Sequence, residues 1–305
     1  SSFMERVSTK MTIRNLVLSG GGPAGLLSFG ALRKLAEKGY WKHADIKRIY
    51  GCSVGSWLAC LLALDYDWDW SQDFLVGRPW EKLLTLDERI LQAYSQQGVF
   101  GEEFFRDSLS PLLKGKNLPL DITLKEFCAA TGIDLYLATV DLNACRGTML
   151  VELTPKTHGD LGLVKAIAAS CALPVIFKPV HHKGSCFIDG GVRCLYPIDL
   201  CLANPCVKPD EVLCIGHSWL GSERVVSEEH NIGWFIRVFL QKILADVAMP
   251  QRTRPLHEVL CDTGWDSSMD EANSLLTSAS CRLELIERGA EAGKAYLTSC
   301  SEQTD

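Results

Sequence analysis

The sequence predicts an α/β fold with a mostly parallel central sheet. Two strand–turn–helix units follow each other near the start of the chain. The first is IRNLVLS, a glycine cluster and a stretch with helical spacing; the second is IKRIY, the turn GCSVG and the apolar SWLACLLAL. Short buried strands that alternate with helices are typical of a parallel sheet covered by helices.

The first unit reads as a buried strand at residues 13–19 and a helix that starts near Gly25. Gly39 marks the end of this helix, because glycine readily adopts the conformation that terminates one. Within the helix, apolar side chains recur at helical spacing at Leu26, Phe29, Leu32 and Leu35.

The rest of the chain contains further strands and a long helical portion. The sequence pattern is mostly helical over residues 65–130 and is helical again beyond residue 220. Between them the sequence predicts strands at 133–142, 147–153, 175–180, 186–191 and 211–216, and a helix at 163–173 that ends before Pro174.

These elements predict one catalytic domain over residues 12–220. Residues 1–11 are expected to form a flexible N-terminus, and residues 221–305 a helical C-terminal portion packed on the same domain. Within that portion an apolar stripe is expected to be core, with a lipid interface as the alternative: Phe235, Phe239, Ile243 and Val247.

Composition excludes several classes of function. The chain has 305 residues and a net charge of −6, without the Lys/Arg block that tracks nucleic acid. No apolar run approaches the ~18 residues of a membrane span. The thirteen cysteines show neither C-x-x-C spacing nor a metal-ligand pattern, so we expect reduced thiols and no metal. No signal peptide is visible in the sequence. We therefore expect a cytoplasmic protein, with peripheral membrane contact as an alternative. The oligomeric state is not indicated.

The glycine cluster after the first strand fits two kinds of site. Gly20, Gly22 and Gly25 match G-x-G-x-x-G, the dinucleotide fingerprint, which also needs an acidic residue after the second strand. Here Asp45 precedes that strand, and no carboxylate follows it. An oxyanion hole is therefore favoured, with flavin or nucleotide binding as the remote alternative.

The second turn has the G-x-S-x-G pattern of a nucleophile elbow. Gly51 and Gly55 permit a tight turn that exposes the Ser53 hydroxyl at the head of the following helix. Both turns follow parallel strands, so the amides of Gly20, Gly21 and Gly22 are expected to face the carbonyl attacked by Ser53. A turn that only caps a helix is the alternative.

Asp189 is the candidate partner of this serine. It follows a short strand and precedes Gly190 and Gly191, which allow the backbone to bend and present the carboxylate. The alternative is an ordinary turn-forming aspartate. His217 could complete a Ser–Asp–His triad, although only two predicted strands precede the elbow, fewer than an α/β-hydrolase normally has. His181 and His182 lie shortly before Asp189.

Together these motifs resemble the patatin-like phospholipase family. The similar segments are SGGGPAGLLSFGAL for the oxyanion loop, GCSVG for the elbow, DGG for the catalytic aspartate and AIAASCALPVIFKPV before it, in order between about residues 15 and 200. The resemblance implies a three-layer α/β/α fold and cofactor-free acyl-ester hydrolysis. It implies Ser53 as nucleophile, Asp189 as base and Gly20, Gly21 and Gly22 as oxyanion donors.

The resemblance also implies the substrate class, a lipid or phospholipid at a membrane or micelle surface. We expect phospholipase A or lysophospholipase activity; a neutral glycerolipid hydrolase, a transacylase and an inactive lipid-binding module are alternatives. One position departs from the family pattern: Ala24 stands where the family usually carries a basic residue. The loop therefore lacks a positive charge for an anionic head group, whereas stabilisation of the oxyanion by the loop amides does not depend on this position.

Overall fold

The structure is a computed structural model that describes residues 12–83, 95–218, 226–230, 235, 238–239, 242, 253–264, 274–275 and 277–302. The helices within these ranges are α1 (Gly25–Glu37), α2 (Val54–Ala63), α3 (Trp68–Gly77), α5 (Glu102–Gly115), α6 (Leu124–Thr131), α7 (Leu163–Cys171), α8 (Ile198–Leu202) and α11 (Ala279–Glu302). None of the helices in these ranges is long and apolar enough to cross a membrane.

The strands form one large sheet and one small sheet. They are β1 (Asn15–Leu18), β2 (Arg48–Cys52), β3 (Gly98–Phe100), β4 (Asp134–Asp141), β5 (Leu150–Leu153), β6 (Val175–Phe177), β7 (Val180–His182), β8 (Ser185–Asp189), β9 (Val212–Ser218) and β10 (His257–Asp262). The large sheet runs β10-β9-β1-β2-β4-β8-β7, with β5 also on β4, and β3 pairs with β6 separately.

The large sheet is mostly parallel, as the sequence predicts. Strands β10, β9, β1, β2 and β4 pair in parallel, while β5, β7 and β8 are antiparallel. Leu18 at the end of β1 pairs with Gly51 in β2 and with Ile215 in β9. The carboxyl ends of these three strands therefore meet at one edge of the sheet, where open α/β sheets bind ligands.

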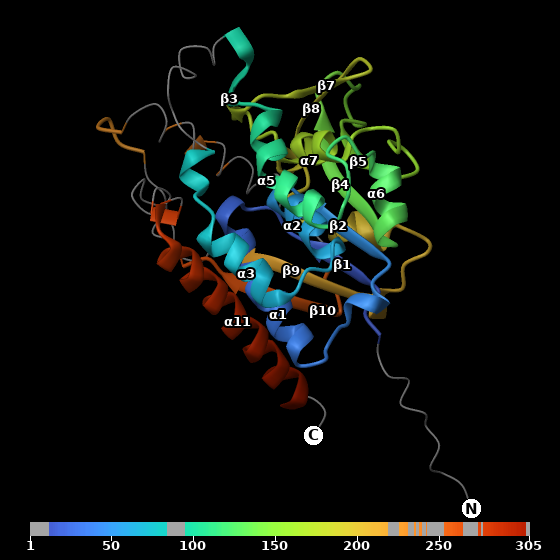
Figure 1. The fold of residues 1–305 in the computed structure, drawn as a ribbon, viewed down its shortest axis with the longest axis vertical. Coiled ribbons are helices and arrows are strands. Elements are labelled where there is room, and N and C mark those ends of the chain that lie inside the picture. The colour runs from blue at the N-terminus through green and yellow to red at the C-terminus, as the bar shows by residue number, and fades with distance from the viewer. Residues whose placement is uncertain are drawn as a thin grey trace, which may run out of the picture.

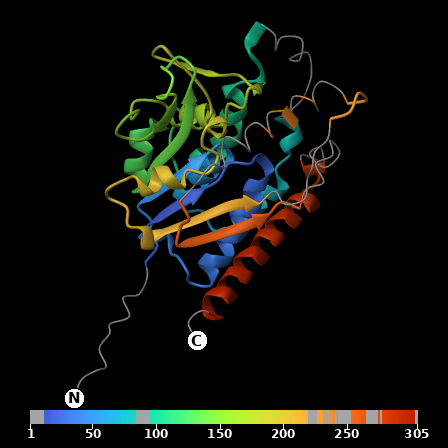
Figure 2. The ribbon, with the colours of Figure 1, turned by 180° about the vertical axis from the view of Figure 1, so that it is seen from behind.

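Helices lie on both faces of the sheet, which gives the expected α/β architecture. Figure 1 shows α1, α2 and α3 in front of the strands, and Figure 2 shows β9 and β10 nearest the viewer from behind. Strand β1 explains the layers, because its residues alternate between faces. Leu16 and Leu18 belong to the larger core under the helices, and Val17 to a smaller core with α8 on the other face.

Helix α11 packs along α1 at very short range (Figure 1). A Cβ on Gly30 would lie 1.9 Å from the Ile286 carbonyl oxygen, and one on Gly289 would lie 2.0 Å from that of Leu27. Glycine is needed at both positions, since only a residue without a side chain lets the two backbones approach this closely. The boundaries at residues 11 and 220 stay predictions, and residues 1–11 lie outside the described ranges.

Two features differ from the expectations for the C-terminal portion. Strand β10 lies within the stretch that reads as helical, and it extends the parallel sheet beside β9. Phe235 and Phe239 are 51% and 53% exposed, so a core position is wrong for these two side chains. Their rings stack on each other, 6.3 Å apart. Ile243 and Val247 lie outside the described residues.

Candidate active site

The serine turn has the strained geometry of a nucleophile elbow. Ser53 lies between β2 and α2 with φ 53° and ψ −127°, a backbone conformation that L-residues rarely adopt. A Cβ on Gly51 would lie 2.6 Å from the Gly55 carbonyl oxygen, and one on Gly55 would lie 2.4 Å from that of Leu18. The two glycines are therefore required, because a side chain on Gly51 would collide with the start of α2 and one on Gly55 would collide with the end of β1.

Ser53 and Asp189 are in direct contact. The Ser53 hydroxyl donates a hydrogen bond of 2.7 Å to Asp189 Oδ2. The other carboxylate oxygen, Oδ1, accepts 2.7 Å from the Gly191 amide. Gly190 fits because a Cβ there would lie 2.3 Å from the Ala138 carbonyl oxygen in β4. The DGG turn thus packs closely against β4 and orients the Asp189 carboxylate toward the Ser53 hydroxyl.

Burial makes this aspartate a stronger base than a solvated one. Asp189 is 3% exposed. Burial raises its pKa to about 6, and the hydrogen bonds from Ser53 and Gly191 oppose this rise only in part. A carboxylate with a raised pKa can accept the proton of a serine hydroxyl more readily while remaining ionised at neutral pH.

Ser170 is a site residue that the sequence analysis did not single out. It lies in α7, is fully buried, and its hydroxyl accepts a hydrogen bond of 3.1 Å from the Ser53 amide. The same hydroxyl donates 2.6 Å to the Ala138 carbonyl oxygen and lies 2.7 Å from Ser56 Oγ. The available signal was a polar side chain within the otherwise apolar stretch AIAASCAL.

The glycine loop lies directly beside the elbow. A Cβ on Gly20 would lie 3.1 Å from Ser53 Cβ, and one on Gly25 would lie 2.6 Å from Val54 Cγ2. Helix α1 therefore starts against the start of α2, with the loop between them. The loop adopts positive φ values of 142° at Gly21 and 55° at Gly22, which favour glycine.

The three loop amides are not equivalent, and this corrects one expectation. The Gly20 amide donates 2.8 Å to the Leu195 carbonyl oxygen, so in this conformation it is already engaged and cannot serve as an oxyanion donor. Among the described residues, no hydrogen-bond acceptor is found for the amides of Gly21 and Gly22. These two donors remain for a ligand oxygen.

The histidine candidates do not complete a triad. His217 is buried, with Nδ1 3.0 Å from the Gly20 carbonyl oxygen and Nε2 2.9 Å from Ser28 Oγ. Burial lowers its pKa to about 4. His181 lies on β7 and contacts Gln97. Within the described part of the chain, no histidine hydrogen-bonds to Ser53 or Asp189, so the structure supports a dyad over a triad.

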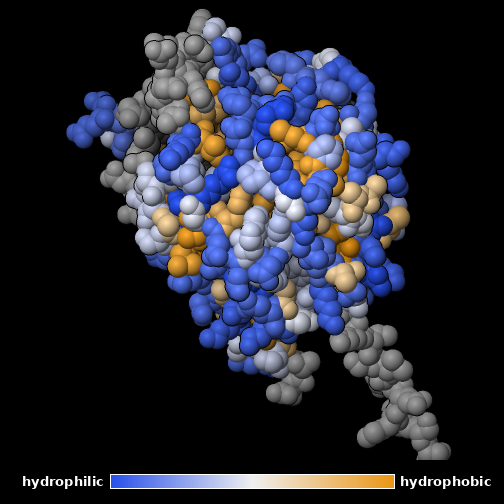
Figure 3. Space-filling view, in the orientation of Figure 1, coloured by the Kyte–Doolittle hydropathy of each residue, from blue (hydrophilic) through white to orange (hydrophobic). Residues whose placement is uncertain are grey.

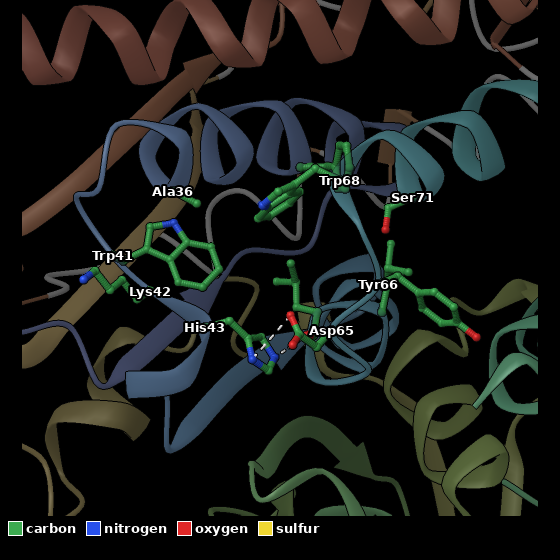
Figure 4. Close-up of a pocket in the computed structure, with 11 residues that line it drawn as sticks. Ala36, Trp41, Lys42, His43, Asp65, Tyr66, Trp68 and Ser71 are labelled. Atoms are coloured by element: carbon green, nitrogen blue, oxygen red, sulfur yellow. Dashed lines mark hydrogen bonds and ion pairs between the residues drawn. The ribbon is translucent and has the colours of Figure 1, made fainter. Parts of the chain in front are cut away.

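A separate cavity lies at the other end of α2. Its volume is about 230 Å³, and Figure 4 shows Trp41 and Trp68 on its walls and the contact between His43 and Asp65 at its rim. Because Ser53 stands at the first turn of α2 and this cavity at the last, the cavity is not part of the dyad site. No cluster of three or more potential metal ligands occurs within the residues that the structure describes.

Comparison with protein families identifies the motif-bearing region. The family profile described as patatin-like phospholipase matches residues 16–202. This range contains the glycine loop, the elbow and the DGG turn in one continuous match.

Comparison with individual proteins gives similar results. The chain is 28% identical over 192 residues to the probable lipid hydrolase 463L of Invertebrate iridescent virus 6, covering 62% of this chain and 63% of the relative. It is 28% identical over 182 residues to lysophospholipase NTE1 of Kluyveromyces lactis, covering 58% of this chain and 11% of the relative. The chain thus spans less than two thirds of the length of either relative.

A solved structure shares the fold. The crystal structure of VipD from Legionella pneumophila aligns with a TM-score of 0.50 at 16% identity, covering 94% of this chain and 67% of that chain. The match extends beyond the family-profile region and includes the C-terminal part of the chain.

Proposed function

Because the chain belongs to the patatin-like phospholipase family, we propose that it hydrolyses the carboxylic esters of lipids with Ser53 as nucleophile and Asp189 as base. The observation that carries this proposal is the 2.7 Å hydrogen bond from the Ser53 hydroxyl to a buried carboxylate. A strained serine at a helix start, beside an amide-rich loop, is the arrangement that acyl transfer requires.

In the first half of the reaction, Ser53 Oγ attacks the ester carbonyl and Asp189 takes the hydroxyl proton. The carbonyl oxygen becomes an oxyanion, which accepts hydrogen bonds from the amides of Gly21 and Gly22. The positive end of the α1 dipole stabilises the same charge, because α1 begins at Gly25 just beyond the loop. When the intermediate collapses, Asp189 returns the proton to the leaving alcohol, and the acyl group stays on Ser53.

In the second half, water releases the acyl group. Asp189 accepts a proton from the water as its oxygen attacks the acyl carbonyl, and the same two amides hold the new oxyanion. Collapse breaks the bond to Ser53 Oγ, which recovers the proton from Asp189. The products are a carboxylic acid and the free enzyme, and a transacylase would differ only in using an alcohol in place of water.

The substrate proposed is a phospholipid or lysophospholipid ester, with a neutral glycerolipid as the alternative. Ala24 offers no charge to a lipid phosphate, so the loop does not favour an anionic head group. The exposed rings of Phe235 and Phe239 support transient contact with a membrane or micelle surface. Figure 3 shows further separate apolar patches on an otherwise hydrophilic face.

A cytoplasmic location is proposed from the cysteines. All thirteen lie within the described residues, none of them forms a disulfide, and most of them are buried. So many cysteines without a disulfide are more compatible with a reducing compartment than with an oxidising one.

The decisive experiment is covalent labelling combined with a lipid panel. A fluorophosphonate should modify the wild-type chain at Ser53 and leave Ser53→Ala unmodified, and mass spectrometry should detect free fatty acid from at least one class of ester lipid. Failure to label a folded wild-type chain would favour an inactive lipid-binding module. A flavin absorbance band in the purified protein would favour the dinucleotide alternative.

A further inference from the structure

Two side chains contact the carbonyl oxygen of Gly20: the buried His217, and Ser19, whose hydroxyl donates a hydrogen bond of 3.0 Å. Nδ1 of His217 lies 3.0 Å from the Gly20 carbonyl oxygen, while the Gly20 amide is bound to the Leu195 carbonyl oxygen. We propose that His217 is a positioning residue for the oxyanion hole: by binding the Gly20 carbonyl, it aims the amide of Gly21 at the reacting carbonyl oxygen. This inference rests on the function proposed above.

The planarity of the peptide bond links the two groups. In a trans peptide the carbonyl of one residue and the amide of the next point in opposite directions. His217 draws the Gly20 carbonyl toward β9 and the first turns of α1, where Ser28 is buried. The Gly21 amide must then point away from this buried side. It emerges next to the nucleophile, because Gly20 itself lies against Ser53.

The chemistry of the contact defines the state of the imidazole. A carbonyl oxygen only accepts hydrogen bonds, so Nδ1 carries the proton. In this tautomer Nε2 is an acceptor for Ser28 Oγ, 2.9 Å away. The backbone of Ala24, at the start of α1, is a further hydrogen-bond partner of the ring. Burial keeps the ring neutral by lowering its pKa to about 4. The histidine is thus fixed between α1 and the loop, with both ring nitrogens engaged.

A glycine loop needs such an anchor more than other loops do. Gly20, Gly21 and Gly22 are consecutive, and glycine has the largest backbone freedom of any residue. Ser19 is the chain neighbour of Gly20 and can move with the loop, whereas His217 ties the same carbonyl to β9. Without His217 the peptide unit could rotate and turn the Gly21 amide away from the substrate. Preorganised donors are what make oxyanion stabilisation effective, since they cost no reorganisation during the reaction. At 7% exposure His217 acts on the reaction through the loop.

Two amide substitutions separate this role from simple space filling. In His217→Asn the side-chain amide nitrogen can occupy the place of Nδ1 and still donate to Gly20. In His217→Gln the amide reaches the place of Nε2 and retains only the contact with Ser28. We expect kcat on a soluble ester to stay within about 3-fold of wild type for the first, and to fall by about 10- to 100-fold for the second and for His217→Ala.

Expressing the rate per active site prevents misfolded protein from lowering the measured kcat. Active sites are counted by stoichiometric fluorophosphonate labelling, and kcat is expressed per labelled site. KM should stay within about 2-fold of wild type, because the oxyanion forms only in the transition state. Affinity for an alkylboronic acid, which forms a tetrahedral adduct on Ser53, should fall in parallel with kcat. His257→Ala, another histidine with a hydrogen bond in the neighbouring strand, should keep wild-type kcat per site.

Any other order of activities overturns the inference. If His217→Gln equals or exceeds His217→Asn, the histidine only fills space, since glutamine is the larger residue. A parallel rise in KM, or unchanged boronate affinity, would equally remove the oxyanion role. A wild-type chain that neither labels nor hydrolyses would contradict the proposed function, whereas an active wild type without this order contradicts only the role of His217.

Discussion

Ser53 and Asp189 lie 136 positions apart in the chain, and their side chains meet at 2.7 Å. The serine stands at the carboxyl end of β2 and the aspartate at the end of β8, and both strands pair with β4. Strand β4 therefore sets the separation of the dyad, with Ala138 beside Cys52 and Thr139 beside Asp189. The single proton of the Thr139 hydroxyl is shared between the carbonyl oxygens of Ala169 and Ile188, at 3.0 and 2.8 Å, which ties α7 and β8 to the same strand.

Removing either member of the dyad should abolish ester hydrolysis. Ser53→Ala removes the nucleophile and Asp189→Asn removes the base, so each should lower kcat/KM by about 1,000-fold or more. The double variant should be no worse than either single one, because the two groups act as one unit. Steady-state kinetics on a soluble ester measures this. Additive losses would show that the residues act independently.

Activity should depend on the ionisation of Asp189. The base works as a carboxylate, and its pKa is raised to about 6. The value of kcat/KM should therefore be constant above this pH and fall about tenfold per unit below it. The matching measurement is the pH profile of kcat/KM with an uncharged ester. A profile that is flat through this range would contradict the assignment of the base.

The local turns of the site could be predicted from the sequence, and its long-range contacts could not. The elbow at Ser53 and the loop at Gly20 rest on glycine spacing within a few residues. The engagement of the Gly20 amide depends on Leu195, which lies 175 positions away and carries no motif. Likewise the role of Ser170 depends on how α7 packs under the elbow.

The same distinction between local pattern and long-range contact decides which elements of the fold could be predicted. Strands β1 and β2 can be predicted from the sequence, because each runs into glycines at its carboxyl end and is followed by a helical pattern. In strand β10 burial alternates from Val259 to Asp262, but the exposed Leu260 is apolar, so the sequence does not alternate in hydropathy, and the strand is defined by its pairing with β9. The exposed Phe235 and Phe239 show that helical spacing of apolar residues does not reveal which side of a helix faces the core.

Burying the carboxylate of Asp189 should cost stability at neutral pH. Its folded pKa is raised above the unfolded value, so the cost is absent below the unfolded pKa and complete above the folded pKa of about 6. At neutral pH the free energy of unfolding of Asp189→Asn should therefore exceed that of wild type by about 1 to 3 kcal/mol. Near pH 4 the difference should vanish.

Denaturant titrations at several pH values test this expectation. Ser53→Ala keeps the titrating carboxylate and removes a hydrogen bond that lowers its pKa, so it should keep a pH dependence of the same sign as wild type, extended to higher pH. A variant Asp189→Asn that is less stable than wild type at neutral pH would mean that the hydrogen bonds of the carboxylate outweigh its desolvation.

Ser170 should support the elbow without taking part in the chemistry. Ser170→Ala removes the acceptor of the Ser53 amide and the hydroxyl that donates to the buried Ala138 carbonyl oxygen. The expected loss is about 1 to 3 kcal/mol in the free energy of unfolding, with a fall in kcat. Ser56→Ala is the matched control, because its hydroxyl contacts Ser170 but not Ser53. Equal kcat values for the two variants would show that the contact with the elbow is unimportant.

The close approach of Gly55 to β1 should make this glycine irreplaceable. In Gly55→Ala the new Cβ would lie 2.4 Å from the Leu18 carbonyl oxygen, and backbone atoms cannot move aside as a flexible side chain would. Helix α2 must then shift away from β1 and carry the Ser53 hydroxyl out of reach of Asp189. We expect a loss of stability of about 1 to 3 kcal/mol, typical of overpacking, and little residual fluorophosphonate labelling.

Gly77→Ala provides the control, since a Cβ there meets no atom within 4 Å, and its stability and labelling should match wild type. If Gly55→Ala labelled as fast as Gly77→Ala, the contact between the elbow and β1 would not be what positions the nucleophile.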